Sequence, residues 1–258
     1  MTRTSWGRIA LQLPLPLLLV LAWWATSRDA TSFFWPPLTQ IVASIREDWL
    51  FAQFVSDLVP SLVRFTAGYV LAVFVGIAGG VWIGVSPRLR QASTPVTEFL
   101  RAIPPPLLLP FVIVTLGVGT LSKIIVIALG AVWPVLLNTI DGVRGVDHLT
   151  VDMARSYGLG RWQRLRWIVL PGASPKITVG MRTGLAVALI LMIISEMVGS
   201  TNGLGFRVLA AQRSFDSAST YGGVIVIGVV GLVVNAGFLV VESRVMRWYR
   251  GSRGLLDD

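Results

Sequence analysis

The sequence predicts an all-α integral membrane protein with six transmembrane helices. Composition is the first reason: 54% of the 258 residues are hydrophobic, only 14% are charged, and the mean hydropathy is +0.72. A soluble domain carries about 25% charged residues, so the chain is neither a soluble enzyme nor a disordered protein. The other two reasons are a series of long apolar stretches and an uneven distribution of Lys and Arg between them.

A helix needs roughly 20 apolar residues to cross a bilayer. The predicted spans are, in order, about Arg8–Ser27, Ser61–Val85, Pro104–Val118, Ser122–Ile140, Ile177–Val198 and Tyr221–Met246. The first follows basic residues, as a signal peptide does, but it has no small-x-small cleavage site and is interpreted as a retained anchor. The third opens on three prolines and could begin earlier, near Pro95, with a bend at Pro104–Pro106.

The basic residues indicate which way the spans run. With the N-terminus placed inside, 15 of the 22 Lys and Arg fall in inner segments and 5 in outer segments, and Arg64 and Arg182 lie in span ends. The outer five are Arg28, Arg46, Lys123, Arg207 and Arg213. This bias predicts that both termini are cytoplasmic. It also accounts for the net charge of +9 without any nucleic-acid partner.

Two features accompany the spans. After Pro36-Pro37, apolar residues at helical spacing between Leu38 and Trp49 predict a short amphipathic helix, either lying on the membrane surface or packed against the spans. Glycines recur at intervals of four in the second and fifth spans, namely Gly76, Gly80, Gly84, Gly180 and Gly184. Small residues at this spacing favour close helix packing; a moving gate is the alternative.

The inner segment at residues 141–176 is much longer than the other inner loops and holds six basic residues. It predicts one helix over Val151–Tyr157, a break at Gly158-Leu159-Gly160, and a second helix over Arg161–Leu170 that is ended by Pro171-Gly172. Two short helices joined at a glycine would form a cytoplasmic projection. Such a projection suits docking to a soluble partner.

Catalytic motifs are missing from the sequence. It has no Cys, one His, no phosphate-binding loop, no metalloprotease or hydrolase motif and no paired carboxylates. Glu196 is the main acid within a span, whereas an ion-driven carrier usually needs buried acids or broken helices. We therefore expect another protein to supply the energy. The rival interpretations are an ion-coupled secondary carrier acting without an ATPase and a membrane-embedded enzyme.

The long inner loop also carries a resemblance. Asp152-Met-Ala-Arg-Ser-Tyr-Gly158, nine residues, and then Ile168-Val-Leu-Pro171 resembles the E-A-A-x3-G-x9-I-x-L-P pattern of permease subunits of bacterial ABC importers. Asp152 stands where Glu is usual and Met153 replaces the first Ala. Four further segments resemble the nitrate/sulfonate/taurine branch, and the resemblance covers about Pro36 to Arg250. They are Arg101–Pro106, Leu121–Ile125, Pro134–Asn138 and Ser195–Gly205.

This resemblance implies a type I ABC importer permease fold in the bacterial inner membrane. Residues 1–60 would form an N-terminal transmembrane helix and an external amphipathic segment, 61–250 the transmembrane domain with its coupling loop at 141–176, and 251–258 a cytoplasmic tail. The implied partners are a second permease copy, a cytoplasmic ABC ATPase dimer, an extracytoplasmic substrate-binding protein and membrane lipid. The chain itself would bind no cofactor or metal and would not be an enzyme, because ATP and Mg would be bound by the ATPase.

The resemblance also implies site residues. The ATPase-coupling candidates are Asp152, Ala154, Arg155, Gly158, Ile168, Leu170 and Pro171, although Arg155, Arg161 and Arg164 could equally be ordinary inner-side charge. The pathway or gate candidates are Arg182, Ser195, Glu196, Asn202 and Gly203. Arg182 could meet an anion or extend to the interface, and Glu196 could instead be a structural hydrogen-bonder at a helix end. The transported molecule would be a small anion of the sulfonate, taurine, nitrate or aromatic carboxylate type.

Overall fold

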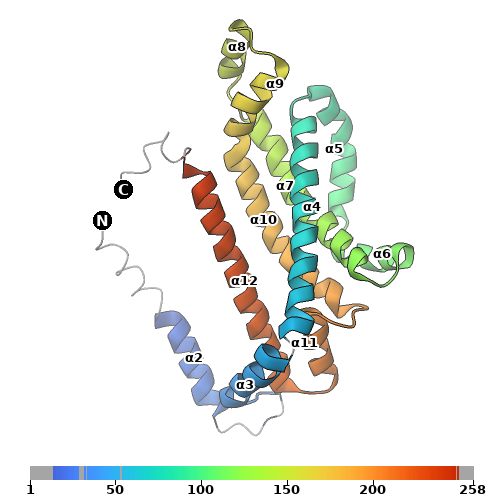
Figure 1. Ribbon diagram of the computed structural model, residues 1–258, viewed down its shortest axis with the longest axis vertical. Helices are drawn as coiled ribbons and strands as arrows, with labels where there is room; N and C mark the ends of the chain where they lie inside the picture. Colours follow the sequence, from blue (N-terminus) through green and yellow to red (C-terminus); the bar gives the residue numbers. More distant parts are fainter. Residues whose placement is uncertain (1–13, 29–31, 33, 53, 248, 250–258) are drawn as a thin grey trace.

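A computed structural model describes residues 14–28, 32, 34–52, 54–247 and 249. The long helices of the described part run roughly along one axis, whereas the short helix α6 lies across it (Figure 1). They are α2 (Pro14–Ser27), α3 (Leu38–Ser44), the π-helices η1 (Ile45–Ala52) and η2 (Phe54–Leu58), α4 (Val59–Gly84), α5 (Pro87–Ala102), the 3-10 turn η3 (Pro105–Leu107), α6 (Leu108–Leu116), α7 (Thr120–Arg144), α8 (His148–Ser156), α9 (Arg161–Arg164), the π-helix η4 (Leu165–Val169), α10 (Leu170–Met197), α11 (Leu204–Arg213) and α12 (Ser217–Val245).

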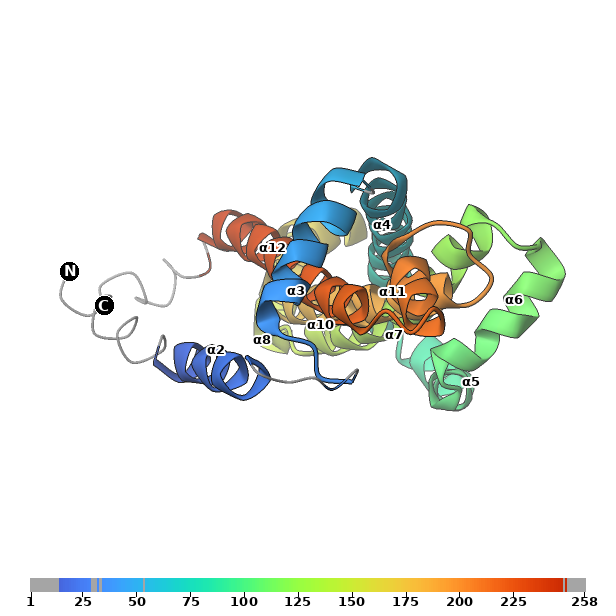
Figure 2. The ribbon, with the colours of Figure 1, turned by 90° about the horizontal axis from the view of Figure 1, so that it is seen from below.

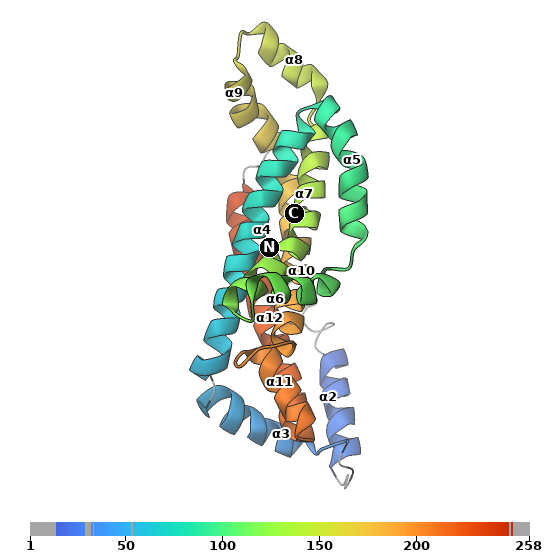
Figure 3. The same cartoon turned by 90° about the vertical axis from the view of Figure 1, so that its right-hand side faces the viewer.

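The centre of the fold is formed by α4, α7 and α10, which pack side by side (Figures 1 and 3). Glycines of α4 face α7 at regular intervals: a Cβ built on Gly76 would lie 2.8 Å from Val135 Cβ, and one on Gly80 would lie 2.5 Å from Thr139 Cβ. Gly180 approaches the α7 backbone in the same way, 2.7 Å from the Pro134 carbonyl oxygen. These glycines, with Gly84 and Gly184, allow the three backbones to approach closely, which is the main route to helix packing in lipid.

Within the described residues, the six predicted spans are confirmed only in part. Four helical runs are long and apolar enough to cross a membrane, namely residues 55–84, 120–144, 161–197 and 217–245. A fifth is reached if α5 and the segment Pro105–Leu116 count as one span. The helix α2 is shorter, and the residues before Pro14 that the first predicted span needs lie outside the described residues.

The third predicted span is a broken helix that begins earlier than expected. It starts at Pro87, passes through Pro95, and bends by 76° at the prolines before α6 (Figure 1). Three consecutive prolines supply no backbone N–H and clash with a preceding helical turn, so the helix stops at Ala102. Helix α5 has no buried residue among its sixteen, and it leaves its polar side chains outside the three-helix centre.

The predicted break at Gly158 is present, but Pro171 does not end the second helix. The N–H of Gly158 bonds to the Arg155 carbonyl and that of Leu159 to the Ala154 carbonyl, both at 3.0 Å, and Gly158 has a φ of +76°. This is the glycine-terminated helix end known as a Schellman motif. Beyond Arg161 the helix continues to Met197. Pro171 is accommodated because it begins a new α-helical turn directly after the wider π-helical turn η4.

At the end of the molecule opposite α8 and α9, short segments join the long helices. Helix α3 crosses beneath α12 (Figure 2), and Ile41 and Trp49 are buried there, so the amphipathic segment packs against the spans. Aromatic rings connect α2 with α12: the Trp23 and Tyr221 ring centroids lie 5.8 Å apart. Clustered Trp and Tyr side chains are typical of the membrane–water interface.

Candidate functional site

A buried network of charged and polar groups joins α4, α10 and the start of α11. Glu196 has no exposed surface, and its Oε1 lies 2.8 Å from Arg64 Nη1, which is itself buried. The Ser61 hydroxyl lies 2.8 Å from both carboxylate oxygens, and the Gly205 N–H donates to Oε2. Hydrogen bonds to its charged groups make a buried ion pair tolerable; here they satisfy the Glu196 carboxylate and both Nη atoms of Arg64, while the buried Arg64 Nε has no hydrogen-bond partner. Glu196 therefore has the geometry of a structural hydrogen-bonder at a helix end.

The same network holds the turn between α10 and α11. Arg64 donates to the backbone oxygen of Asn202 at 3.1 Å and also to its side-chain oxygen. The Gly203 N–H donates to Asp57 Oδ1 at 2.8 Å. Gly203 has a φ of +117°, and a Cβ there would lie 2.5 Å from the Glu196 carboxylate. The turn thus requires glycine for two independent reasons.

Glu196, Asn202 and Gly203 are three of the five predicted pathway or gate candidates, and no partner was predicted for them. Asp57, Ser61 and Arg64 supply the partners, and none was singled out. A signal existed: Arg64 and Glu196 are a base and an acid that fall near the outer ends of two predicted spans. Charges within spans usually pair with one another.

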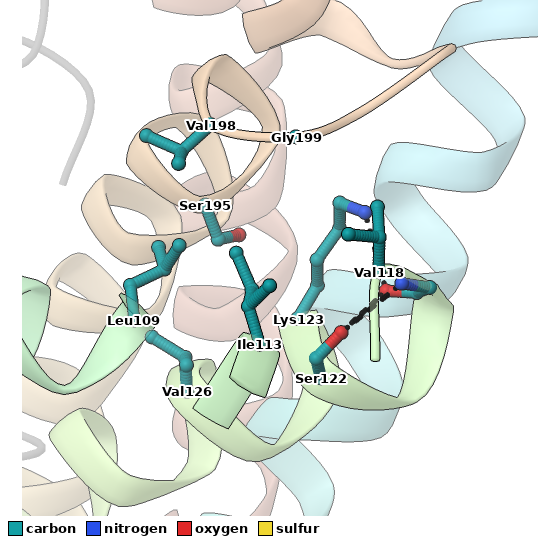
Figure 4. Close-up of a pocket in the computed structure, with 10 residues that line it drawn as sticks. Leu109, Ile113, Val118, Ser122, Lys123, Val126, Ser195, Val198 and Gly199 are labelled. Carbon is teal, nitrogen blue, oxygen red and sulfur yellow. Dashed lines mark hydrogen bonds between the residues drawn. The ribbon is translucent and has the colours of Figure 1, made fainter. Parts of the chain in front are cut away.

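Ser195, the remaining neighbour of Glu196, faces a different space. It lines a small hollow of about 10 Å³, room for roughly one water molecule, between α6, the first turns of α7 and the end of α10 (Figure 4). Apolar side chains such as Leu109 and Val126 form most of the wall, and Lys123 is the charged residue among the lining residues. Ser195 and Lys123 face the hollow from α10 and α7, respectively.

The remaining pathway candidate, Arg182, lies at a helix surface. Half of its side chain is exposed, and its Nη2 is 3.9 Å from Glu242 Oε2 of α12. At this separation the contact is a loose ion pair between neighbouring helices. The structure does not bring Arg182 together with Ser195 and Glu196, which lie more than three helical turns further along α10.

The coupling candidates lie in the hairpin of α8 and α9, which projects beyond the ends of α4, α7 and α12 (Figures 1 and 3). Asp152 and Arg155 are exposed and form an ion pair with atoms 3.4 Å apart. Ala154 is buried, and Ile168, Leu170 and Pro171 are half-buried. Large apolar side chains cover the outside of the hairpin and are exposed by 54–79%; they are Leu149, Met153, Tyr157, Trp162 and Trp167.

Such exposure would be ordinary on a lipid-facing helix, but this hairpin projects beyond the ends of α4, α7 and α12, and its second helix is the very start of the run 161–197 (Figure 1). A contiguous apolar patch in water marks a surface that another molecule covers. Four arginines lie on the same hairpin, namely Arg155, Arg161, Arg164 and Arg166. Among the described residues, no group of three or more His, Asp or Glu could hold a metal ion.

Comparison with known proteins gives a consistent result. Residues 58–249 match the family described as binding-protein-dependent transport system inner membrane component. The chain is 30% identical over 239 residues to the taurine transport system permease protein of Escherichia coli, covering 90% of this chain and 87% of that protein. It is 32% identical over 186 residues to the nitrate import permease protein of Leptolyngbya laminosa, covering 72% and 67%. Its fold resembles an inward-facing structure of the MetNI methionine ABC transporter, with a TM-score of 0.67, 17% identity, and 76% and 97% of the two chains covered.

Proposed function

Because the chain belongs to the family of inner membrane components of binding-protein-dependent transport systems, and so is a permease subunit of an ABC importer, we propose that it moves a small anion of the sulfonate or nitrate type. The anion class is supported by the names of two relatives, which transport taurine and nitrate. We further propose that a separate ATPase hydrolyses ATP, bound with Mg, for this chain.

The observation that carries the proposal is the hairpin of α8 and α9. Its exposed aromatic side chains, Tyr157, Trp162 and Trp167, lie among arginines, where the hairpin projects beyond α4, α7 and α12. Enriched aromatic and Arg side chains are typical of the centres of protein interfaces. The proposed occupant is the cytoplasmic ATPase. We accordingly propose that this end of the molecule and both termini lie on the cytoplasmic side.

One continuous helix supports a mechanical link from this end to the other. The run from Arg161 to Met197 comprises 37 residues, or about 55 Å of helix at 1.5 Å per residue. It begins in the hairpin and ends at the Glu196 network. A displacement of the hairpin by the ATPase would therefore move α10 as a rod and shift the α10–α11 turn, where we place the binding protein. A second copy of the chain would complete the pathway, surrounded by lipid.

A mild-detergent purification of the tagged chain from its native membrane tests the assembly. We expect an ATPase with a phosphate-binding loop to co-elute at one copy per permease. The purified complex, reconstituted in vesicles with its binding protein, should take up radiolabelled taurine, an aliphatic sulfonate or nitrate only when ATP is supplied. A chain that elutes alone and transports on an ion gradient without ATP would instead establish the secondary carrier.

A further inference from the structure

The break between α5 and α6 lies at the depth of the apolar helices. A Cβ built on Gly130 would lie 3.0 Å from Pro105 Cβ, so the break packs against the middle of α7 (Thr120–Arg144). Helix α7 is long and apolar enough to cross a membrane. The break therefore lies at the depth of the hydrocarbon core and not at a membrane surface.

A helix interrupted at this depth leaves backbone groups without their usual partners. In a continuous helix, the carbonyl oxygens of Arg101 and Ala102 would accept the N–H groups of residues 105 and 106, but both of these are prolines. No residue of α5 is buried, so the rest of this chain leaves the helix uncovered (Figure 3). Interrupted backbone within a membrane is tolerated only where it is buried in protein or lines a water-filled cavity.

The exposed surface of α5 is divided into a polar and an apolar face. Four exposed polar residues recur at intervals of three or four and so share one face of the helix. They are Gln91, Thr94, Glu98 and Arg101. The neighbouring face is apolar, and Val96 and Phe99 are exposed there by 57% and 69%. This division indicates that α5 meets water on the first face and lipid or protein on the second.

The polar face ends in an ion pair beside the break. Arg101 lies one helical turn before Pro105, and its Nε and Nη2 bond to Glu98 Oε2 at 2.9 and 2.5 Å. The two side chains are 47% and 55% exposed. Charges within a membrane face a bundle interior or a water-filled cavity, where they mark substrate pathways. Arg101 Nη1 finds no acceptor among the described residues, so its N–H donors are available to a ligand.

We propose that the broken helix α5–α6 lines a water-filled pathway between two copies of the chain, and that Arg101 contacts the oxyanion group of the substrate in transit. This inference rests on the proposed function, since it names the residue that meets the transported anion. A guanidinium holds its N–H donors in one plane, which matches two oxygens of a sulfonate, carboxylate or nitrate group. Glu98 occupies one side of the guanidinium and keeps the contact weak, so the anion is released again. The competing role for the pair is a contact between copies that excludes water.

The first test compares the access of water to the two faces of α5. Because the chain contains no cysteine, E98C and F99C each introduce a single thiol, at nearly the same depth. The complete importer in open membrane fragments, which admit reagent from both sides, is treated with an anionic methanethiosulfonate. We expect E98C to react at least about tenfold faster than F99C, because only a thiol that water reaches ionises and meets the reagent.

The second test replaces the cation in the complete importer reconstituted in vesicles. Uptake is measured with whichever probe the wild type transports: radiolabelled taurine, an aliphatic sulfonate or nitrate. We expect R101Q to lower uptake about tenfold or more while ATPase stimulation by the loaded binding protein stays within about twofold, because one charge-assisted contact with the substrate is lost. R101K should retain part of the uptake. R88Q, at the exposed start of the same helix, is the matched control and should change neither quantity.

The double variant R101Q/E98Q removes the carboxylate that R101Q leaves without its partner. We expect its uptake to stay as low as that of R101Q, because the lost cation and not the remaining acid limits the passage of the anion. Recovery of uptake in the double variant, or wild-type uptake by R101Q, would overturn the contact between Arg101 and the substrate.

The labelling result distinguishes the remaining outcomes. Equal reactivity of the two thiols, whether fast or slow, would overturn the pathway face of α5. Two unreactive thiols, together with a parallel fall of uptake, ATPase stimulation and thermal stability in R101Q, would assign the ion pair to a contact between copies. If R101Q does not fold, the labelling decides alone. Failure of the wild type to take up any probe with ATP would instead refute the proposed function, whereas the labelling needs no substrate.

Discussion

Two ion pairs of the same chemistry lie at opposite ends of the molecule. Arg64 and Glu196 are 2.8 Å apart, with 6% and 0% of their side chains exposed. Arg155 and Asp152 are 3.4 Å apart and exposed by 69% and 65%. The first pair is held by Ser61 and by backbone N–H groups, whereas the second lies on one turn of the hairpin. An arginine–carboxylate pair therefore stabilises the fold at one end of the molecule, whereas a pair of the same kind at the other end is available to a partner.

The difference shows how burial sets the consequence of losing a charge. Removing one member of a buried pair leaves the other unpaired in a low-dielectric environment, which costs about 3–5 kcal/mol. Removing one member of an exposed pair costs about 0–1 kcal/mol, because water and salt replace it. Variants at the buried end should therefore lower stability, whereas variants at the exposed end should change the coupling to the ATPase with little change in stability.

The largest effect is expected at the buried end. Glu196→Ala should reduce the free energy of unfolding by about 3–5 kcal/mol, because Arg64 is left buried without its counter-charge. The measurement is the thermal unfolding midpoint of the purified chain in detergent. The matched control is Glu98→Gln, which breaks an exposed pair with Arg101 and should leave the midpoint unchanged. Equal midpoints for the two variants would contradict a structural role for the network.

A smaller loss of stability, but a complete loss of uptake, is expected at Gly158. A β-branched residue at a φ of +76° is strained by about 1–3 kcal/mol. A Cβ at Gly158 would meet nothing within 4 Å, so Gly158→Val should disturb the hairpin alone. We expect insertion to be retained and the unfolding midpoint to fall less than in Glu196→Ala, while ATP-driven uptake is lost.

Gly160→Val is the matched control for the hairpin, since Gly160 has an ordinary φ of −64° and a Cβ there would make only a normal contact with Gln163. Uptake by this variant should remain close to that of the wild type. Normal ATP-driven uptake by Gly158→Val would show that the hairpin does not couple the ATPase to transport.

The same contrast explains what the sequence could predict. Helix type, the positions of the long spans and the glycine break followed from hydropathy and local conformational rules, which act within one segment. The bend before α6 was predicted because three prolines cannot continue a helix. The continuation through Pro171 was missed because a π-helical turn ahead of a proline depends on packing along the whole run, not on the residues 161–171 themselves.

The buried site was less predictable than the exposed one. The hairpin candidates, such as Gly158 and Asp152, are local in sequence, and a spacing pattern was enough to find them. The network joins Ser61 to Glu196 and Asp57 to Gly203 across 135 and 146 residues of sequence, respectively. Only the packing of α4 against α7 and α10 brings these groups together. A single sequence gives no direct measure of that packing.

A moderate effect is expected from the exposed aromatic surface. Trp162 is 69% exposed, so Trp162→Ser should leave the unfolding midpoint unchanged and weaken capture of the ATPase by about tenfold, the loss typical of an aromatic interface residue. Trp162→Phe keeps an apolar ring and should retain most of the capture. Quantitative pull-down of the co-expressed ATPase measures both. An unchanged yield with Trp162→Ser would place the docking surface elsewhere on the hairpin.

The smallest effect is expected at Asp152, the exposed counterpart of Glu196. Asp152→Asn breaks the pair with Arg155, and we expect the free energy of unfolding to change by less than about 0.5 kcal/mol. If the carboxylate meets a basic group of the ATPase, the apparent affinity of the ATPase should fall severalfold, and more steeply at low salt, where surface charges are least screened. Asp152→Glu keeps the charge and should preserve that affinity. A fall of the unfolding midpoint as large as that of Glu196→Ala would remove the distinction between the two ends, because exposure would then not decide the cost of losing an acid.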